Sequence, residues 1–439
     1  MLILQQSLFV LLCAVAIWLF SRKVGQIRRN ILLGKDEETG GNKAARWKNV
    51  LLLAFGQKKM FRKPFVALLH FFVYAGFVII NIEILEIVLD GILGQHRMFA
   101  PIGNLYSILI NCFEVLAFLV LASCVVFLIR RNIVRVWRIS NGNKELKGWP
   151  RTDANLILIT EIILMSLFLV LNASDTLLQA RGSEHYLAHP TGNFFLSQYL
   201  QPMLNGFSDQ GLVVIERSCW WLHIAGIFAF LNYLPYSKHL HIVLAFPNTY
   251  YARQEPLGEM ENMPAVQNEV LYAMQPELAP TDAAPPHRFG AKDVMDLSWK
   301  NLMDAYSCTE CGRCTAACPA NITGKLLSPR KIMMDTRDRL EEVGKNIRAN
   351  GSFKDDSKSL LHNYISTEEL RACTTCNACV QECPVAISPL SIILQLRRYL
   401  VMEESNSPQE WAGMFSNVEN NFAPWKFSPD ERDKWAVES

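Results

Sequence analysis

Five long apolar runs dominate the first 236 residues, at 2–20, 65–92, 105–129, 156–171 and 212–234. An α-helix rises about 1.5 Å per residue, so roughly 20 residues cross a hydrocarbon core about 30 Å thick. The run at 156–171 is the shortest, and its ends are the least sharply defined. The pattern predicts five transmembrane helices.

After residue 236 the apolar runs give way to shorter patterns. Residues 253–290 are rich in Pro, Glu and Ala and have no sustained period, which predicts a flexible or extended connection. Residues 328–343, SPRKIMMDTRDRLEEV, have helical periodicity, with Ser328 as N-cap and Pro329 in the first turn. We expect a membrane domain at 1–245, a linker at 246–290, a further domain at 291–403 and a C-terminal tail at 404–439.

The first apolar run could be mistaken for a cleaved signal peptide. It lacks a positively charged segment ahead of it, and its apolar run is too long for the core of such a peptide. Ser21, Arg22 and Lys23 follow it instead of a small-residue cleavage site. The run is therefore interpreted as the first membrane helix.

Basic residues are distributed unevenly between the connecting segments. Residues 21–63 contain twelve Lys and Arg and residues 130–151 contain seven, whereas 94–104 and 176–211 contain only Arg97 and Arg181. The positive-inside rule places the N-terminus outside and everything after the fifth span in the cytoplasm. The chain is thus expected to be a multi-pass protein of the bacterial inner (cytoplasmic) membrane.

Composition changes this picture little. Half of the residues are hydrophobic, which is high for a soluble enzyme of this size, and the net charge is +2. No basic stripe with interleaved aromatic residues suggests nucleic-acid binding. The sequence also has no phosphate-binding loop, dinucleotide glycine fingerprint or nucleophile elbow, so nucleotide binding and hydrolysis have no support.

Eight of the twelve cysteines form two copies of the pattern C-x2-C-x2-C-x3-C-P, as CTECGRCTAACP at 308–319 and CTTCNACVQECP at 373–384. Cys13, Cys112, Cys124 and Cys219 lie in apolar runs, where they act as small hydrophobic residues. A reducing cytoplasm argues against disulfides, and zinc sites would not require a third close cysteine followed by a fourth and a Pro. The spacing is that of bacterial ferredoxins with two 4Fe–4S clusters.

In such ferredoxins three close cysteines bind one cluster and the fourth binds the other. The predicted ligands of the first cluster are Cys308, Cys311, Cys314 and Cys383, and those of the second are Cys373, Cys376, Cys379 and Cys318. Small residues such as Gly312, Ala316 and Ala378 would let backbone N–H groups approach the sulfur atoms. The long helical segment between the repeats favours a helical ferredoxin over a compact βαββαβ one.

Histidines in two of the spans suggest a second cofactor, because ionisable groups in hydrocarbon usually serve a site. His70 lies near the start of the second span, His223 in the middle of the fifth, and His239 and His241 just after it. Two histidines from facing helices can bind a haem iron from both sides. The alternative is that each histidine makes a structural hydrogen bond or lies at headgroup level, but their occurrence ahead of a cluster domain favours a b-type haem.

The pairing of these histidines stays open at this point. Counted from the helix ends, His70 lies roughly 8 Å deep and His223 roughly 20 Å deep, while His239 and His241 lie near the interface. His70 matches the last two in depth better than it matches His223. His223 would belong to a second haem, but Ile80 and Cys112 occupy the nearest levels.

Carboxylates also lie within the spans. Glu114 and Glu161 could relay protons to a quinone or pair with neighbours, whereas Glu216 is expected to pair with Arg217. The predicted fold class is all-α: a five-helix transmembrane haem b bundle followed by a cytoplasmic α-helical ferredoxin domain.

HFFVYAGF in the second span, YLPYSKHLHI after the fifth, the two cysteine motifs and the tail FSNVENNFAPWKFSPDERDKWA together resemble the membrane-bound heterodisulfide-reductase-like iron–sulfur oxidoreductases. These join a nitrate-reductase-gamma-like haem b domain to a two-cluster ferredoxin domain. The resemblance covers nearly the whole chain. It implies an oxidoreductase subunit that carries electrons between menaquinone and a soluble partner, for some relatives electron-transferring flavoprotein.

In longer relatives the tail leads into cysteine-rich CCG domains, which the sequence lacks. A separate CCG-domain iron–sulfur subunit is therefore expected as a partner, beside menaquinone and membrane lipid. The catalytic residues are left unassigned, because the catalytic centre would be shared with that partner. The alternative is a membrane-anchored iron–sulfur redox sensor or scaffold without quinone chemistry, which would need no haem.

Overall fold

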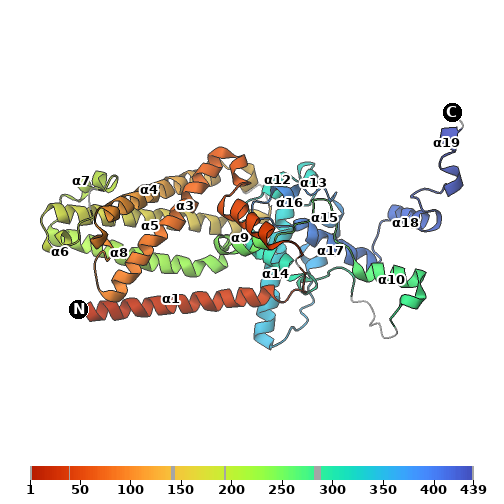
Figure 1. Cartoon of the computed structure of the whole chain (residues 1–439), viewed down its shortest axis with the longest axis horizontal. Coiled ribbons are helices and arrows are strands. Elements are labelled where there is room, and N and C mark those ends of the chain that lie inside the picture. Colours follow the sequence, from red (N-terminus) through yellow and green to blue (C-terminus); the bar gives the residue numbers. More distant parts are fainter. Residues whose placement is uncertain (1, 39, 140–143, 192–193, 281–287, 438–439) are drawn as a thin grey trace.

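The computed structural model describes residues 2–38, 40–139, 144–191, 194–280 and 288–437 (Figure 1). Over these residues the fold is helical, with no strand and two isolated β-bridges. The membrane-length helices are α1 (Leu2–Ile31), α3 (Pro64–Leu93), α4 (Asn104–Asn132), α5 (Trp149–Ala180) and α8 (Asp209–Tyr233). The shorter helices before the second half are α2 (Lys43–Asn49), α6 (Glu184–Leu187), α7 (Gln201–Leu204) and α9 (His241–Tyr250). The expected all-α class is confirmed.

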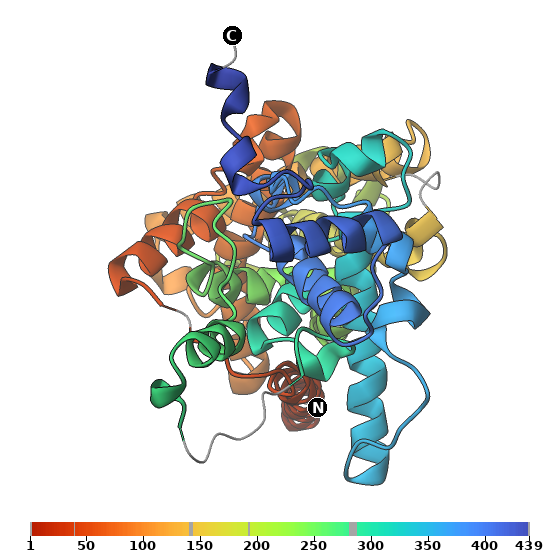
Figure 2. The same ribbon diagram turned by 90° about the vertical axis from the view of Figure 1, so that its right-hand side faces the viewer.

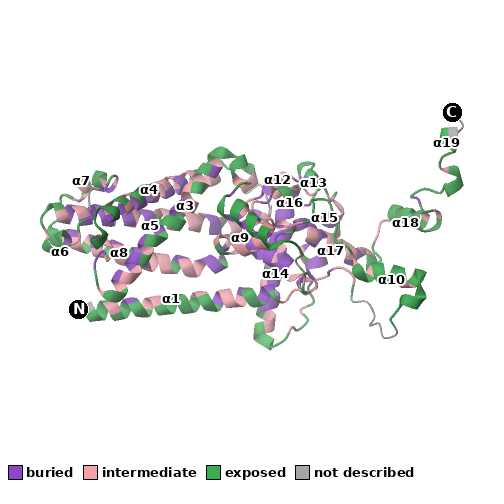
Figure 3. Ribbon diagram, in the orientation of Figure 1, coloured by how far each residue is buried: buried purple, intermediate pink, exposed green. Residues whose placement is uncertain are grey.

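The five long helices form an elongated bundle, and each is long and apolar enough to cross a membrane. Within it α3 packs on α4, α4 on α5 and α5 on α8, while α1 lies along α3 and α8. Their outward faces carry exposed apolar residues. Much of the α1 ribbon is coloured as exposed in Figure 3. Such a surface suits contact with lipid, which has no polar group to offer the backbone.

The fourth span is the longest of the five, not the shortest. The prediction was too short because Asn172 and Asp175 interrupt the apolar run, yet both are fully buried inside the bundle. Their side chains bind Arg97, so the helix continues through them to Ala180. A prediction from hydropathy alone ends a span at its first polar residues, even when these residues are buried and paired inside the bundle.

The second half packs against one end of the bundle (Figures 1 and 2). Its helices are α11 (Trp299–Ser307), α12 (Arg313–Ala316), α13 (Pro319–Ile322), α14 (Pro329–Asn350), α15 (Thr367–Arg371), α16 (Ala378–Glu382) and α17 (Pro389–Met402). Residues 288–403 form what we call the cysteine domain. The predicted helix at Ser328 is confirmed, since the Ser328 hydroxyl accepts a hydrogen bond from the backbone N–H of Lys331.

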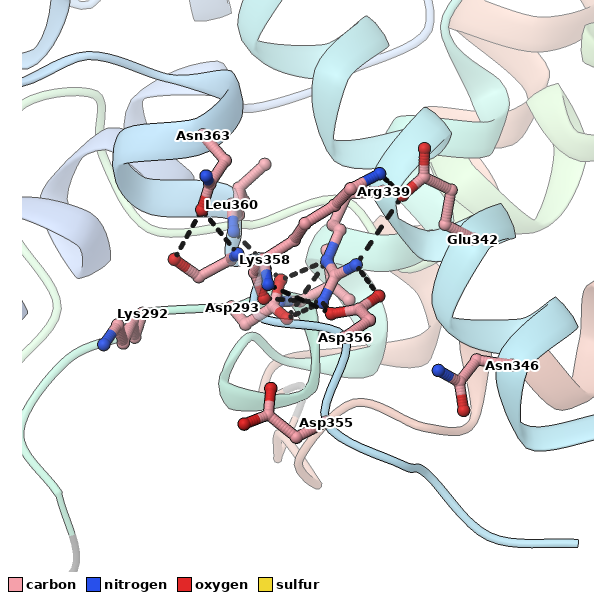
Figure 4. Close-up of polar contacts among 12 residues, drawn as sticks. Lys292, Asp293, Arg339, Glu342, Asn346, Asp355, Asp356, Lys358, Leu360 and Asn363 are labelled. Carbon is pink, nitrogen blue, oxygen red and sulfur yellow. Dashed lines mark hydrogen bonds and ion pairs between the residues drawn. The ribbon is translucent and has the colours of Figure 1, made fainter. Parts of the chain in front are cut away.

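A buried arginine organises the long connection between the cysteine repeats. Arg339 on α14 is fully buried and donates to both Asp293 and Asp356, at 2.7 Å and 2.6 Å, and to the carbonyl of Lys358 (Figure 4). The Asp293 carboxylate also accepts from the backbone N–H of Leu360. One guanidinium thus fixes the segment after α14 against the start of the cysteine domain.

The expected linker is partly helical. Helix α10 (Pro264–Met274) forms within it, starting at a Pro in the first turn and continuing through good helix formers. Residues 281–287 of the linker lie outside the described part of the chain. The tail contains α18 (Gln409–Asn421) and α19 (Lys434–Val437), which extend away from the body in Figure 1.

Candidate redox cofactor site

The two cysteine repeats fold alike. Glu310 and Gly312 in the first loop have φ of 53° and 69°, and Thr375 and Asn377 at the same motif positions have φ of 55° and 59°. These left-handed residues turn backbone N–H groups toward the thiols, and that of Thr375 donates to the Cys373 sulfur at 3.4 Å. Each loop therefore presents its cysteines with the backbone around them, as a cluster-binding loop does.

Cys318 of the first repeat lies with the cysteines of the second. It lines one small cavity together with Cys373, Cys376 and Cys379, and apolar side chains such as Leu390 close the rest of the wall. The fourth cysteine of the first motif thus lies with the three close cysteines of the second.

Cys383 makes the reciprocal arrangement, because its thiol neighbours Cys311, and Cys314 neighbours Cys308, Cys311 and Cys383. Burial raises the pKa of the Cys308 and Cys383 thiols to about 12. A positively charged metal centre would be needed to hold them as thiolates at neutral pH.

The thiols line a cavity and do not come close enough together to bind one metal ion. Among the described residues, no three His, Cys, Asp or Glu side chains are close enough to hold a single metal ion. A cubane differs from a single ion in this respect, because each of its four thiolates binds a different iron. The donor set fits 4Fe–4S clusters.

A cavity of about 510 Å³ lies between the bundle and the cysteine domain. It falls within the range of protein sites for organic cofactors. All four predicted histidines line it, namely His70, His223, His239 and His241, and so do Glu161, Cys311 and Pro384. The structure thus places the candidate haem ligands and a cysteine of the first motif on the walls of one cavity.

The histidines differ in what their Nδ1 atoms contact. Nδ1 of His70 lies 3.0 Å from the Gln57 side-chain oxygen, that of His223 3.0 Å from the Leu164 carbonyl and that of His241 3.0 Å from the Lys238 carbonyl. An Nδ1–H that donates to an oxygen leaves Nε2 with the lone pair that binds a metal. The Nδ1 of His239, in contrast, is buried without a hydrogen-bond partner.

Position separates the histidines further. His241 interacts electrostatically with both His70 and His239, and the rings of His239 and His241 are 5.7 Å apart. His223 packs against Phe168, with ring centroids 5.9 Å apart, and no other histidine lies among the groups that act on it. His70 is therefore grouped with His241 and His239 and not with His223.

Basic side chains line the cavity near Cys311. Among them are Arg130, Arg131, Arg138 and Arg313. Nε of Arg131 and Nη1 of Arg138 are buried and have no hydrogen-bond partner. Unpaired buried guanidinium atoms favour an anionic group in the cavity.

Some site features were not foreseen from the sequence. Gly312 lies against the membrane half, since a Cβ there would come within 2.4 Å of the Arg330 guanidinium and 2.9 Å of the Arg138 side chain. Glu310, two residues after Cys308, forms ion pairs with Lys238 and, at 2.8 Å, with Arg337. No motif in the sequence links residues so distant along the chain.

The three span carboxylates singled out from the sequence have different surroundings. Glu161 lines the large cavity. Glu114 is fully buried away from it and accepts from the backbone N–H groups of Leu196 and Ser197, both at 2.8 Å. Glu216 pairs with Arg217 at 2.7 Å, as expected.

Comparison with known proteins shows which proteins the chain is similar to. Residues 307–387 match a model for the 4Fe–4S dicluster domain. A probable iron-sulfur-binding oxidoreductase of Bacillus subtilis, FadF, is 28% identical over 100% of this chain and 61% of its own length. An EtfAB:quinone oxidoreductase of Syntrophomonas wolfei is 27% identical over 93% of this chain and 56% of its own. One subunit of the ferredoxin/F420H2-dependent CoB–CoM heterodisulfide reductase of Methanosarcina acetivorans is 32% identical over 27% of this chain and 60% of its own.

No solved structure matches the chain. The chain spans about three fifths of the length of the first two relatives. Its homologues are iron–sulfur oxidoreductases, so the resemblance expected from the motifs is confirmed. The relatives support an oxidoreductase role and iron–sulfur clusters.

Proposed function

We propose that this relative of iron–sulfur oxidoreductases is a membrane electron-transfer subunit of a menaquinone-linked oxidoreductase, and that it holds two 4Fe–4S clusters and one b-type haem. The observation that carries the proposal is the single cavity whose walls include both His70 and His241 and also Cys311. When bound, these cofactors accept and donate electrons one at a time. The chain's own residues bind them, orient them and shield them from water.

We assign the thiols as their grouping suggests. Cys308, Cys311, Cys314 and Cys383 would hold one cluster, and Cys373, Cys376, Cys379 and Cys318 the other. Each motif then contributes cysteines to both clusters. Loss of either cluster would therefore disturb the loops of both motifs. Apolar walls and the backbone N–H groups around the sulfur atoms would tune the reduction potentials.

His70 and His241 are the residues that we assign to hold the haem iron. Both have Nδ1 held by an oxygen, and His241 acts electrostatically on His70. The unpaired atoms of Arg131 and Arg138 would bind the haem propionates, because a guanidinium pairs readily with a carboxylate. A second haem at His223 would lack a histidine partner, since Ile80 lines the cavity where one is needed.

Menaquinone would reach the same cavity from the lipid. The wall between α3 and α5 is mostly apolar, and Glu161 is the carboxylate within it. A carboxylate beside a quinone can give or take the protons that accompany its electrons. Glu114 is assigned a structural role, because both of its oxygens already accept backbone hydrogen bonds.

We assign the cysteine domain to the cytoplasm. The two segments rich in Lys and Arg lie beside this domain, as when Lys59 donates to the Cys383 carbonyl at 2.9 Å and Arg330 to the Arg138 carbonyl at 2.7 Å. Basic loops face the cytoplasm in bacterial membrane proteins. A soluble partner, either a CCG-type subunit or electron-transferring flavoprotein, would dock on the cysteine domain and the tail. The tail exposes Trp411, Phe415 and Trp425, which fits such a contact.

Quinol-driven reduction tests this proposal. The purified protein, in lipid nanodiscs, is mixed anaerobically with a water-soluble menaquinol analogue while the optical spectrum is recorded. We expect a b-type α band to rise, and we expect His70→Ala to remove it at unchanged iron–sulfur content. A wild-type spectrum that lacks the band, with both clusters present, would favour the sensor or scaffold instead.

A further inference from the structure

The end of the bundle away from the cysteine domain, the left end in Figure 1, has a polar core. We call it the distal end. Arg97, in the connection between α3 and α4, is buried there and donates to Asp175 at 2.9 Å and to the Asn172 side-chain oxygen at 3.0 Å. Glu83 on α3 lies 3.8 Å from the same guanidinium. The proposed function uses none of these groups.

Carboxylates outnumber cations in this core. Six carboxylates there have at most 6% exposure, namely Glu83, Glu86, Asp90, Glu114, Asp175 and Glu216. The guanidinium groups beside them belong to Arg97 and to the partly exposed Arg217. A surplus of buried negative charge is unfavourable, so part of it must be neutralised by protons.

Hydrogen bonds single out the carboxylate that would hold such a proton. Asp90 accepts from the backbone N–H groups of Arg97 and Met98, both at 2.9 Å, and Glu86 accepts from Phe99 and Tyr106. Glu114 and Glu216 have the partners described above. Oε2 of Glu83 is buried without a hydrogen-bond partner, and Glu83 is only 3% exposed.

Further unpartnered polar atoms lie between Glu83 and the distal surface. They are Nδ2 of Asn172, fully buried, and Nε2 of His96, which is 9% exposed. Buried polar groups left without a protein partner are commonly satisfied by ordered water. His96 Nε2 is 3.8 Å from Asp175, and the His96 ring lies 5.2 Å from that of the exposed His185. Asp175, His96 and His185 thus form a series of protonatable groups that reaches the surface, and Arg97 lies between Asp175 and Glu83.

The large cavity approaches the same residue from the other side. Ile80 and Ile84 line the cavity, and Ile80 lies one turn before Glu83 on α3. Residues three apart share a helix face. Glu83 therefore lies between the proposed quinone cavity and the polar distal end.

We propose that Glu83 is a proton-carrying residue that exchanges protons with the distal face through Asp175, ordered water and His96. That these protons come from or go to a quinone rests on the proposed function. Oxidation of a quinol breaks an O–H bond for each electron passed to an iron cofactor. Glu83 would first release its own proton to water on the distal side, and its carboxylate would then form a new O–H bond with the proton from the quinol. Reduction of a quinone would reverse each transfer.

The charged and titratable groups that act on Glu83 come from several elements. Arg97 approaches from the connection after α3, Glu86 from its own helix, and Tyr106 and Glu114 from α4, while Asp175 on α5 is joined to Glu83 through Arg97. Arg97 is shared between Glu83 and Asp175 and lies 3.8 Å from the first but 2.9 Å from the second, so Glu83, the less closely paired carboxyl, is the one we assign the proton.

Infrared spectroscopy tests the protonated state without any turnover. Wild-type protein, Glu83→Gln and the control Glu184→Gln, an exposed residue of α6, are compared at neutral pH in lipid. We expect a buried-carboxyl C=O band that shifts in D2O, persists in Glu184→Gln and is lost in Glu83→Gln. A band of unchanged intensity in Glu83→Gln overturns the proposal.

Proton release to the distal face tests the connection. A pH-sensitive dye is enclosed in, or added outside, proteoliposomes of known protein orientation, and a menaquinol analogue supplies electrons with ferricyanide as acceptor. We expect Glu83→Gln to slow proton appearance on the distal side at least roughly tenfold, and Glu83→Asp to restore part of the rate. Equal rates in wild type and Glu83→Gln contradict the proposal.

The two tests separate the possible failures. If the wild-type vesicles do not oxidise the quinol at all, the proposed function fails, and the infrared band still decides the role of Glu83. If Glu83→Gln loses bound iron through misfolding, Glu83→Asp decides instead: a displaced carboxyl band with partial proton release supports the proposal, and wild-type values for both overturn it.

Discussion

At the scale of single residues, the atom that binds Nδ1 decides what each histidine of the cavity can hold. His70 and His241 have an oxygen at Nδ1, whereas His239, two residues before His241, has none. The sequence identified all of them as candidates, because histidines near membrane spans are unusual. It could not rank them, because Gln57 and the Lys238 carbonyl become neighbours only through the fold.

The histidines provide a matched pair of variants. His241→Ala should remove nearly all of the b-type α band, since an axial ligand is lost, while His239→Ala should leave most of it. Reduced-minus-oxidised spectra, normalised to cluster iron, measure both. The reverse ranking would transfer the axial role to His239.

The spacing of the motif predicts which thiols belong to which cluster, and this assignment stays a prediction. Cys318→Ser should disturb the cluster of Cys373, Cys376 and Cys379, because Cys318 shares their cavity. Cluster iron should fall from about eight toward about four per chain, or a three-iron signal should appear in the spectrum of the second cluster. Damage confined to the cluster of Cys308 would refute the crossed arrangement, and Cys124→Ser in the bundle is the matched control.

At the scale of elements, buried polar residues shape the helices that hydropathy predicts least well. Helix α5 extends to Ala180 because Asn172 and Asp175 find Arg97, which lies in a different connection. The existence and order of the spans follow from the apolar runs alone, but this length depends on a tertiary partner. The same holds for the connection after α14, where Arg339 selects the path of a segment that has no pattern of its own.

Removing that arginine isolates its contribution. Arg339→Leu would leave the partly buried carboxylates of Asp293 and Asp356 without their cation, so we expect the cysteine domain to lose about 1.5–3 kcal/mol of stability. Denaturant unfolding followed by cluster absorbance measures this change, with Arg337→Leu as a second arginine on the same helix. A loss below about 1 kcal/mol would show that Arg339 is not the organising residue of this segment.

At the scale of the whole molecule, the two halves are joined by ion pairs between the basic loops and the cysteine domain. Glu145 of the membrane half pairs with Arg330 of α14 at 2.8 Å, and Ser328 also donates to it. The apolar runs predict the membrane half, and the distribution of Lys and Arg predicts that the basic loops share one side of the membrane. Neither pattern could predict this contact, whose partners lie far apart in the sequence.

This ion pair makes the docking of the two halves depend on pH. Burial raises the pKa of Glu145, but Arg330 and Ser328 outweigh it and hold the pKa below its ordinary value of 4.5. The stabilisation is therefore complete above pH 4.5 and is lost as the pH falls through the lower pKa of the folded protein. Hydrogen exchange of α14 measured between roughly pH 3 and 6 should show this loss, and Glu145→Gln should flatten the dependence. Parallel profiles for the variant and the wild type would contradict it.

The central claim is that paired iron–sulfur clusters lie beside a haem held by His70 and His241 in one cavity. Quantification of acid-labile sulfide, non-haem iron and pyridine haemochrome on the same sample of intact protein tests it most directly. We predict about eight non-haem irons and one b-type haem per chain. The full content of cluster iron with no haem would contradict the account.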